Sequence, residues 1–233
     1  MRGYITAATK RISGGDELMA QRFLVTGGAG YVGSHLVAAL LDRGDDVTVL
    51  DNLRTGHRTA VSAGARLVVA DLADIAPLDA VLSDGSWDAV FHFASLSQVG
   101  ESMRMPMRYL LDNAANGIRL IDACVRHGVR RFVLSSTAAL FNLDSAEPIA
   151  EDAPIDPQSA YGDSKWMIER ALRWAGQVHG LRSACLRYFN AAGADPAGRL
   201  GEDHRPETHL IPLVIDAALG RRPELEVFVY FYE

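Results

Sequence analysis

The chain has 233 residues, of which 48% are hydrophobic, and its formal net charge is −6. This length suits one large domain, alone or with a small second lobe, and the hydrophobic content excludes an intrinsically disordered chain. The acidic total disfavours a general nucleic-acid or membrane-surface binder, because both partners attract a basic face. No apolar run reaches the length of about 18 residues that a membrane span needs.

Two further features bear on the location of the protein. The two cysteines, Cys124 and Cys185, indicate neither a disulfide framework nor a zinc site, so we predict a reducing, cytoplasmic environment. Residues 1–20 lack both the apolar stretch of a signal peptide and any clear period, which predicts a mostly disordered leader. The ordered pattern starts directly after Met19, which makes Met19 an alternative start.

Apolar runs and helical periods predict an alternation of strands and helices. In chain order the elements are strand 23–26, helix 31–42, strands 47–50 and 67–70, helix 77–82, strand 89–93, helix 107–127, strand 131–135, loop 146–157, helix 159–179, strand 183–188, a glycine-rich loop to 207 and helix 210–219. Gly44, Gly128 and Gly180 follow three of these helices and are well placed to end them. The alternation implies βαβ units with right-handed crossovers and a parallel sheet.

A glycine-rich turn, TGGAGYVG at 26–33, joins the first strand to the first helix. Gly27, Gly30 and Gly33 allow the tight turn and the close approach of the backbone to a pyrophosphate, which the free N–H groups of the helix start would bind. The motif counts because a strand precedes it, a helix follows it and Asp51 ends the next strand. We therefore predict an α/β fold with a Rossmann-type, doubly wound parallel sheet that binds a dinucleotide.

The end of the second predicted strand bears on which dinucleotide binds. A carboxylate at Asp51 would accept hydrogen bonds from the adenosine ribose and repel a 2′-phosphate, which favours NAD over NADP. Arg54, close by in sequence, could weaken this preference. The alternative is that Asp51 is a turn or helix-capping aspartate.

A Y-x-x-x-K pattern places Tyr161 and Lys165 on one face of a predicted helix. Free tyrosine, with a pKa of about 10, is a poor base at neutral pH. A lysine ammonium and the positive nicotinamide ring both favour the phenolate, so we expect the pKa of Tyr161 to be lowered. Tyr161 could then take a hydroxyl proton while hydride leaves for the nicotinamide.

The hydroxyl run Ser135-Ser136-Thr137 supports this pattern, which alone occurs often by chance. It ends the fifth predicted strand, at the edge of the sheet where open α/β folds bind their ligands. A hydroxyl there can hydrogen-bond the reacting oxygen and fix its geometry. Taken alone, the run could equally be a polar strand end.

At this point the residues resemble a known family, the UDP-glucose 4-epimerases, which are extended short-chain dehydrogenases/reductases. The similarity covers about residues 22–228 and rests on the segments TGGAGYVGSH (26–35), DNL (51–53), HFA (92–94), VGES (99–102), YGDSK (161–165), LRYFN (186–190), GED (201–203) and GRRP (220–223). The resemblance implies an NAD-binding Rossmann domain at 21–188 and part of a nucleotide-sugar-binding lobe at 189–233. It also implies a homodimer paired through the two long helices.

The resemblance also implies roles for individual residues. Thr137, Tyr161 and Lys165 would be catalytic, with Tyr161 as base and acid, Lys165 on the nicotinamide ribose and Thr137 on the 4-oxygen of the sugar. The NAD site would be lined by Gly27, Gly30, Tyr31, Val32, Gly33, Asp51, Asn52, Asp71, Leu72, Phe93, Ala94, Asn113, Ser135, Tyr161, Lys165 and Tyr188. The UDP-sugar would contact Thr137, Tyr161, Phe189, Asn190 and Leu210, and no metal is implied.

The implied reaction is the 4-epimerisation of a UDP-hexose, UDP-galactose or UDP-glucose, through a transient 4-keto sugar, with NAD regenerated in each cycle. Ala138 and Ala139 stand where 4,6-dehydratases carry an Asp-Glu pair, which disfavours dehydration. An epimerase for UDP-linked N-acetylated sugars, pentoses or uronic acids stays open. So does an inactive NAD-binding protein that acts as a sensor, a partner or a pseudogene product.

Three departures from the family pattern stand out. Ser97 replaces a lysine that often helps hold phosphates, and Phe141-Asn142 replaces a Tyr-Gly pair. The chain stops at Glu233, well short of a full epimerase, so we expect a truncation or frameshift relative to a longer parent. The ending VFVYFYE (227–233) is β-prone and would be either a buried strand of a complete protein or an exposed, self-associating edge.

Overall fold

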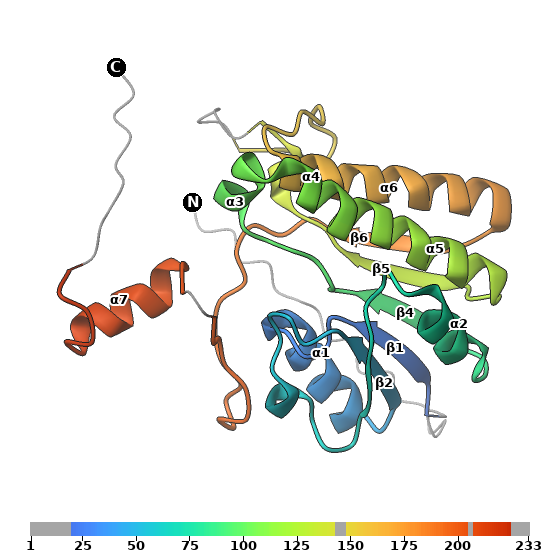
Figure 1. Cartoon of the computed structure of the whole chain (residues 1–233), viewed down its shortest axis with the longest axis horizontal. Coiled ribbons are helices and arrows are strands. Elements are labelled where there is room, and N and C mark those ends of the chain that lie inside the picture. Colours follow the sequence, from blue (N-terminus) through green and yellow to red (C-terminus); the bar gives the residue numbers. More distant parts are fainter. Residues whose placement is uncertain (1–19, 143–147, 205–206, 225–233) are drawn as a thin grey trace.

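The structure, a computed structural model, describes residues 20–142, 148–204 and 207–224. Six parallel strands form one sheet in the order β3-β2-β1-β4-β5-β6, which is the arrangement of a doubly wound Rossmann fold (Figure 1). The strands are β1 Arg22–Thr26, β2 Asp46–Asp51, β3 Arg66–Val69, β4 Ala89–His92, β5 Arg131–Ser135 and β6 Arg182–Leu186. The predicted fold class is thereby confirmed. The predicted tail at 227–233 and almost all of the predicted leader at 1–20 lie outside the described residues.

The register of the sheet brings the ends of the strands to one edge. Val25 of β1 pairs with Val49 of β2 on one side and with Phe91 of β4 on the other. All pairings are parallel, so the carboxyl ends of the strands meet at the same edge. Central strands are nearly continuous apolar runs because both of their faces are covered.

Helices cover both faces of the sheet (Figure 1). On one face, Leu78, Leu120 and Ile168 from α2 (Ile75–Ser83), α5 (Asn116–Arg126) and α6 (Ala160–His179) join a core cluster with strand residues that include Leu24 and Leu50. On the other face, helix α1 (Tyr31–Asp42) packs on β1 and β2. There Val37 and Leu40 meet Phe23, Val25, Val47 and Val49.

The predicted helix over 107–127 is interrupted. The chain forms α3 (Val99–Arg104), α4 (Pro106–Tyr109) and a π-helical turn at Leu110–Ala115 before α5. The sequence missed α3 and the π-helical turn. Two short 3-10 turns, Arg58–Ala60 and Ala138–Leu140, were also not predicted, and they carry little sequence signal because each spans only three residues.

The last element, α7 (Leu210–Ala218), lies apart from the sheet (Figure 1). None of its residues is buried, and Leu210 is 65% exposed. Within the described parts of the chain, no helix is both long and apolar enough to cross a membrane.

Candidate functional site

The glycine turn after β1 is so closely packed that two of its positions have no room for a side chain. Gly27 has φ +75°, and a side chain there would put its Cβ 2.3 Å from Ala94 N. A Cβ on Gly33 would lie 2.2 Å from the carbonyl oxygen of Gly27. Only glycine fits at these two positions. Helix α1 starts at Gly30 with no side-chain cap, so its first N–H groups face the turn as an anion site.

Asp51 ends β2 directly beside this turn and is 7% exposed. Its carboxylate accepts hydrogen bonds from the N–H groups of Ala29 at 3.0 Å and Leu53 at 2.8 Å. The aspartate therefore fixes the turn, as the alternative interpretation of this residue expected. Since each carboxylate oxygen has a second lone pair, the same group can still accept from a ribose hydroxyl.

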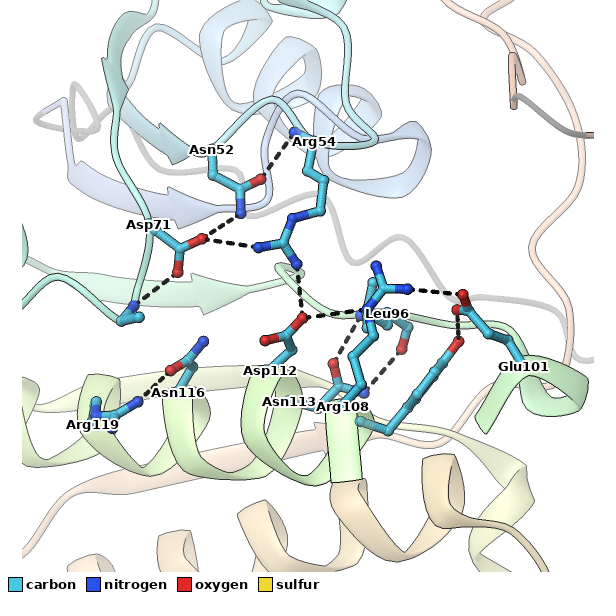
Figure 2. Close-up of polar contacts among 12 residues, drawn as sticks. Asn52, Arg54, Asp71, Leu96, Glu101, Arg108, Asp112, Asn113, Asn116 and Arg119 are labelled. Carbon is cyan, nitrogen blue, oxygen red and sulfur yellow. Dashed lines mark hydrogen bonds and ion pairs between the residues drawn. The ribbon is translucent and has the colours of Figure 1, made fainter. Parts of the chain in front are cut away.

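Asn52 and Asp71, at the ends of β2 and β3, point toward one another (Figure 2). Asn52 Nδ2 donates to Asp71 Oδ2 at 2.7 Å, and the N–H of Ala73 donates to Asp71 Oδ1 at 2.9 Å. The Ala73 hydrogen bond is the main cause that lowers the pKa of Asp71. Leu72, the next residue, is buried in the core. The structure thus brings the predicted adenosine-side residues to one edge.

Asn113 explains the π-helical turn (Figure 2). It is fully buried, and its amide pairs with the backbone of Leu96, accepting from Leu96 N at 2.8 Å and donating to Leu96 O at 2.9 Å. A third contact joins Asn113 Nδ2 to Ser164 Oγ at 3.2 Å. The turn thereby ties the segment after β4 to α6, and π-turns of this kind are frequent at functional sites.

The predicted catalytic residues converge where β5 ends and α6 begins. Ser159 caps α6 by accepting from Gly162 N, which orients its first turn. The Thr137 side chain lies near the Tyr161 phenol and acts to lower its pKa. Lys165 Nζ donates to Ser95 Oγ and to the carbonyl oxygen of Ser135, both at 2.8 Å. The structure thus brings Thr137, Tyr161 and Lys165 close together.

The lowered pKa expected for Tyr161 depends on the nicotinamide ring as well as on Lys165, and the protein by itself does not produce it. Burial raises the pKa of Tyr161, and the nearby Thr137 side chain only partly opposes this shift. Lys165 Nζ lies 5.9 Å from the tyrosine ring centroid, and burial lowers the pKa of this lysine to about 7. Lys165 Nζ donates its hydrogen bonds to Ser95 and Ser135 and not to the phenol, so the lowered pKa of Tyr161 stays a prediction for the protein with its cofactor bound.

The neighbouring strand end is also held by polar contacts. Tyr188 hydrogen-bonds Ser135 through its hydroxyl, so two residues predicted for the NAD site meet directly. Below them, the buried carboxylate of Glu169 accepts from Ser136 Oγ at 2.6 Å and from Arg187 Nη2 at 2.6 Å. Sequence spacing did not identify Glu169 or Arg187.

The predicted substrate residues are only partly assembled. Thr137 and Tyr161 meet, but Phe189 is 66% exposed and Leu210 is 65% exposed. Asn190 is exposed as well. Of the three departures, Ser97 is exposed, while Phe141 is buried under the Arg187 guanidinium, 5.4 Å from its ring centroid. A packing role thus accounts for the phenylalanine.

Glu202, His204, Glu207 and His209 form a cluster that the sequence analysis missed, and their potential ligand atoms all lie within 4.8 Å of one another. His209 Nδ1 already pairs with Glu202 at 2.9 Å and with Glu207 at 3.0 Å. Polar contacts among its own members therefore help to hold the cluster together. It touches the glycine turn through His204, whose ring lies 6.3 Å from that of Tyr31.

The strand order, the glycine turn at the switch in that order and the Tyr161–Lys165 cluster define a Rossmann-type domain built to hold a dinucleotide. The chain belongs to the NAD dependent epimerase/dehydratase family, whose model matches residues 23–230.

The chain is similar in sequence to curated UDP-glucose 4-epimerases. A UDP-glucose 4-epimerase of Azospirillum brasilense is 49% identical over 212 residues, a match that covers 91% of this chain and 61% of that protein. The UDP-glucose 4-epimerase of Halalkalibacterium halodurans is 46% identical over 205 residues, covering 88% and 61%. The chain thus spans 61% of the length of these two relatives.

The chain is also similar, in fold and in sequence, to solved structures of epimerases. The UDP-glucose 4-epimerase of Brucella ovis in complex with NAD is 41% identical, with a TM-score of 0.86 over 90% of this chain and 64% of that one. The Bifidobacterium longum enzyme in complex with NAD+ and UDP is 31% identical, with a TM-score of 0.82 over 88% and 64%. A UDP-N-acetylglucosamine 4-epimerase of Methanobrevibacter ruminantium is 32% identical, with a TM-score of 0.77 over 87% and 64%.

Proposed function

We propose that this chain binds NAD and takes part in the 4-epimerisation of a UDP-hexose, interconverting UDP-galactose and UDP-glucose through a transient 4-keto sugar. The observation that carries the proposal is the cluster of Tyr161, the nearby Thr137 and Lys165, whose Nζ lies 5.9 Å from the centroid of the tyrosine ring. The relatives named UDP-glucose 4-epimerases and the NAD in the Brucella ovis complex support it.

The chain fits the cofactor on steric and electrostatic grounds. Gly27 and Gly33 let the turn pack against the backbone of Ala94 and of the turn itself, where a Cβ would clash, and this places the turn beside the uncapped start of α1, where a diphosphate would accept N–H donors. Asp51 would accept from the adenosine ribose, and Asp71 lies one strand further along the edge. We propose that the other residues predicted for the NAD site line it as well.

The chemistry follows from the cluster. When bound, NAD supplies the acceptor and donor for the hydride of carbon 4. Tyr161 would take the proton of the 4-hydroxyl and later return it, while Thr137 holds the same oxygen. Because burial raises the pKa of Tyr161, the phenolate needs positive charge nearby, which the nicotinamide ring and protonated Lys165, 5.9 Å from the centroid of the tyrosine ring, would supply together.

The proposal also assigns different functions to two regions of the chain. Residues 21–188 would form the NAD-binding domain, and 189–233 would contribute part of the nucleotide-sugar lobe. Phe189, Asn190 and Leu210 would reach the substrate from that lobe. Their exposure is consistent with a contact surface that substrate or further protein covers.

An assay of UDP-galactose conversion to UDP-glucose, with added NAD, tests the proposal. Tyr161→Phe should abolish conversion while NAD still binds, since the ring is kept and only the hydroxyl is lost. Conversion of UDP-N-acetylglucosamine but not of UDP-galactose would instead favour an N-acetylhexosamine epimerase. NAD binding without turnover of either sugar would favour an inactive NAD-binding protein.

We also propose a homodimer paired through α5 and α6. Ile118 of α5 is 43% exposed, and Trp174 and Val178 of α6 are 64% and 67% exposed. These residues line a groove between the two helices, and apolar grooves of this kind mark protein interfaces. A cytoplasmic location is proposed as well, supported by the free thiols of Cys124 and Cys185.

Sedimentation of the purified chain tests the dimer. Trp174→Glu places a charge in the groove and should shift the protein from dimer to monomer. Arg173→Glu changes the charge of the neighbouring exposed residue of α6 and serves as the control. A monomeric parent chain would refute the dimer without bearing on NAD binding.

A further inference from the structure

Arg54 is held by two carboxylates from different parts of the chain (Figure 2). Its Nη1 donates to Asp112 Oδ2 at 2.7 Å, and its Nη2 lies 3.5 Å from Asp71 Oδ2. Asp71 follows β3, whereas Asp112 belongs to the π-helical turn before α5, 58 residues away from Arg54 in sequence. The guanidinium therefore bridges the edge of the sheet to the helical layer.

The local backbone directs Arg54 toward these partners. Leu53 has φ +56°, a left-handed conformation that is uncommon for a residue with a side chain. Asp51 Oδ1 accepts from Leu53 N at 2.8 Å, and Asn52 Oδ1 accepts from Arg54 N at 3.0 Å. The two hydrogen bonds hold the turn that follows β2 and thereby fix the backbone position from which the Arg54 side chain extends.

Asp112 is also held by a second arginine, Arg108. Arg108 Nε lies 3.8 Å from Asp112 Oδ2, and Arg108 Nη1 donates to Glu101 at 2.9 Å (Figure 2). A half-exposed ion pair contributes little on its own, but these charges form a connected network. Counting Asp71, Asp112 and Glu101 against Arg54 and Arg108, the network is net negative by one charge.

An arginine near the ribose carboxylate is the feature that accommodates a 2′-phosphate in NADP-binding sites. Arg54 follows Asp51 by three residues, which places it close to the predicted ribose site. Its guanidinium, however, is already paired with the carboxylates of Asp112 and Asp71. We propose that Asp112 is a positioning residue that holds Arg54 away from the ribose 2′ position, so that the site selects the dinucleotide without a 2′-phosphate. This inference rests on the proposed NAD function and extends it to a residue that does not touch the cofactor.

Fluorescence titration with NADH and NADPH tests the inference, with the ratio of the two dissociation constants as the readout. Asp112→Asn keeps the size of the side chain but removes its charge, which should free Arg54. We expect NADPH binding to improve relative to NADH binding by about fivefold, the scale that one partly exposed ion pair can set. The double variant Asp112→Asn/Arg54→Met should return the ratio to that of the parent chain.

Asp122→Asn is the matched control, because Asp122 forms an exposed pair with Arg126 on α5 at 2.9 Å. This variant should leave the ratio unchanged. The inference is overturned by an unchanged ratio in Asp112→Asn, or by an equal gain in the double variant, which would show that removing negative charge suffices without Arg54. A parent chain that binds neither dinucleotide would refute the proposed function instead, and the two failures are therefore distinguishable.

Discussion

The side-chain nitrogen of Lys165 lies 2.8 Å from the carbonyl oxygen of Ser135, which joins α6 to the carboxyl end of β5. The same nitrogen donates to Ser95 Oγ, and the side chain is 1% exposed. Burial disfavours the charged form and lowers the pKa of Lys165 to about 7. A lysine in the proposed catalytic cluster therefore changes its charge near neutral pH.

Direct titration should reveal this lysine. The chain contains two lysines, Lys10 and Lys165, so carbon-13 labelling of lysine gives two side-chain signals. We expect one signal to titrate near pH 7 and to be lost in Lys165→Met, and the other to titrate near the ordinary value of about 10.4. Two signals that titrate only in alkaline solution would show that the hydrogen bonds to Ser95 and Ser135 offset the cost of burial.

Stability should follow the same group. Since the folded pKa of Lys165 lies below the unfolded pKa, the unfolded chain binds more protons between them, and burying the charge costs most below about pH 7. The free energy of unfolding should therefore gain up to about 1.4 kcal/mol per pH unit as the pH rises above 7. Urea unfolding at pH 7, 8 and 9 should show this slope in the parent chain and not in Lys165→Met.

His92 should make the protein sensitive to acid. It is fully buried at the end of β4, with Nδ1 2.7 Å from Thr26 Oγ1, and burial lowers its pKa to about 3. A depressed pKa contributes stability above the unfolded value of about 6.5 that is lost as the pH falls toward the folded value. We expect a loss of about 2 to 3 kcal/mol between pH 6.5 and 4.5.

Urea unfolding at these two values of pH measures the loss. His92→Asn keeps a polar group near Thr26 without a titrating ring, so it should lower stability at neutral pH yet flatten the dependence on pH. His179→Asn, at an exposed histidine that ends α6, is the control. An equal loss in the parent chain and in His92→Asn would assign the acid sensitivity to other groups.

The sheet could be predicted because its strands are short apolar runs between turn residues. Strand β5 occupies 131–135 as predicted, and helix α1 occupies 31–42 as predicted. The π-helical turn could not be predicted from its own residues, whose period is helical throughout. It is associated with hydrogen bonds between Asn113 and Leu96, which lie 17 positions apart in sequence.

The site was predictable where a local pattern marks it and not where distant residues meet. Tyr161 and Lys165 are four apart, so helix geometry places them together. The bridge from Arg54 to Asp112 joins two turns 58 positions apart, and no spacing rule connects them. The burial that raises the pKa of Tyr161 could not be predicted for the same reason, because it comes from packing between distant segments.

Glu169 and Arg187 should form a stabilising pair at the end of β6. Glu169 is 8% exposed, and Arg187 contacts both of its carboxylate oxygens, at 3.0 and 2.6 Å. Arg187→Met leaves a buried carboxylate without its cation, and we expect it to lower the free energy of unfolding by about 2 to 3 kcal/mol.

A second substitution separates the charge from the packing. Glu169→Gln/Arg187→Met should recover at least part of the loss, because glutamine can still accept from Ser136 and carries no charge. Thermal unfolding of the two variants beside Arg182→Met, at an exposed position of β6, measures the difference. A double variant less stable than Arg187→Met alone would show that packing, not charge, dominates.

The glycine turn makes the sharpest prediction about folding and binding together. A Cβ on Gly33 would lie 2.2 Å from the carbonyl oxygen of Gly27, which belongs to backbone that cannot move aside cheaply. We expect Gly33→Ala to destabilise the chain by about 3 kcal/mol and to abolish NADH binding. Gly100→Ala is the matched control, because Gly100 lies in α3 with no other atom within 4 Å of an added Cβ. Alanine there should leave stability unchanged or raise it by up to about 1 kcal/mol, the difference in helix propensity. If Gly33→Ala instead binds NADH as the parent does, the turn is not where the diphosphate lies, and the placement of the dinucleotide must be revised.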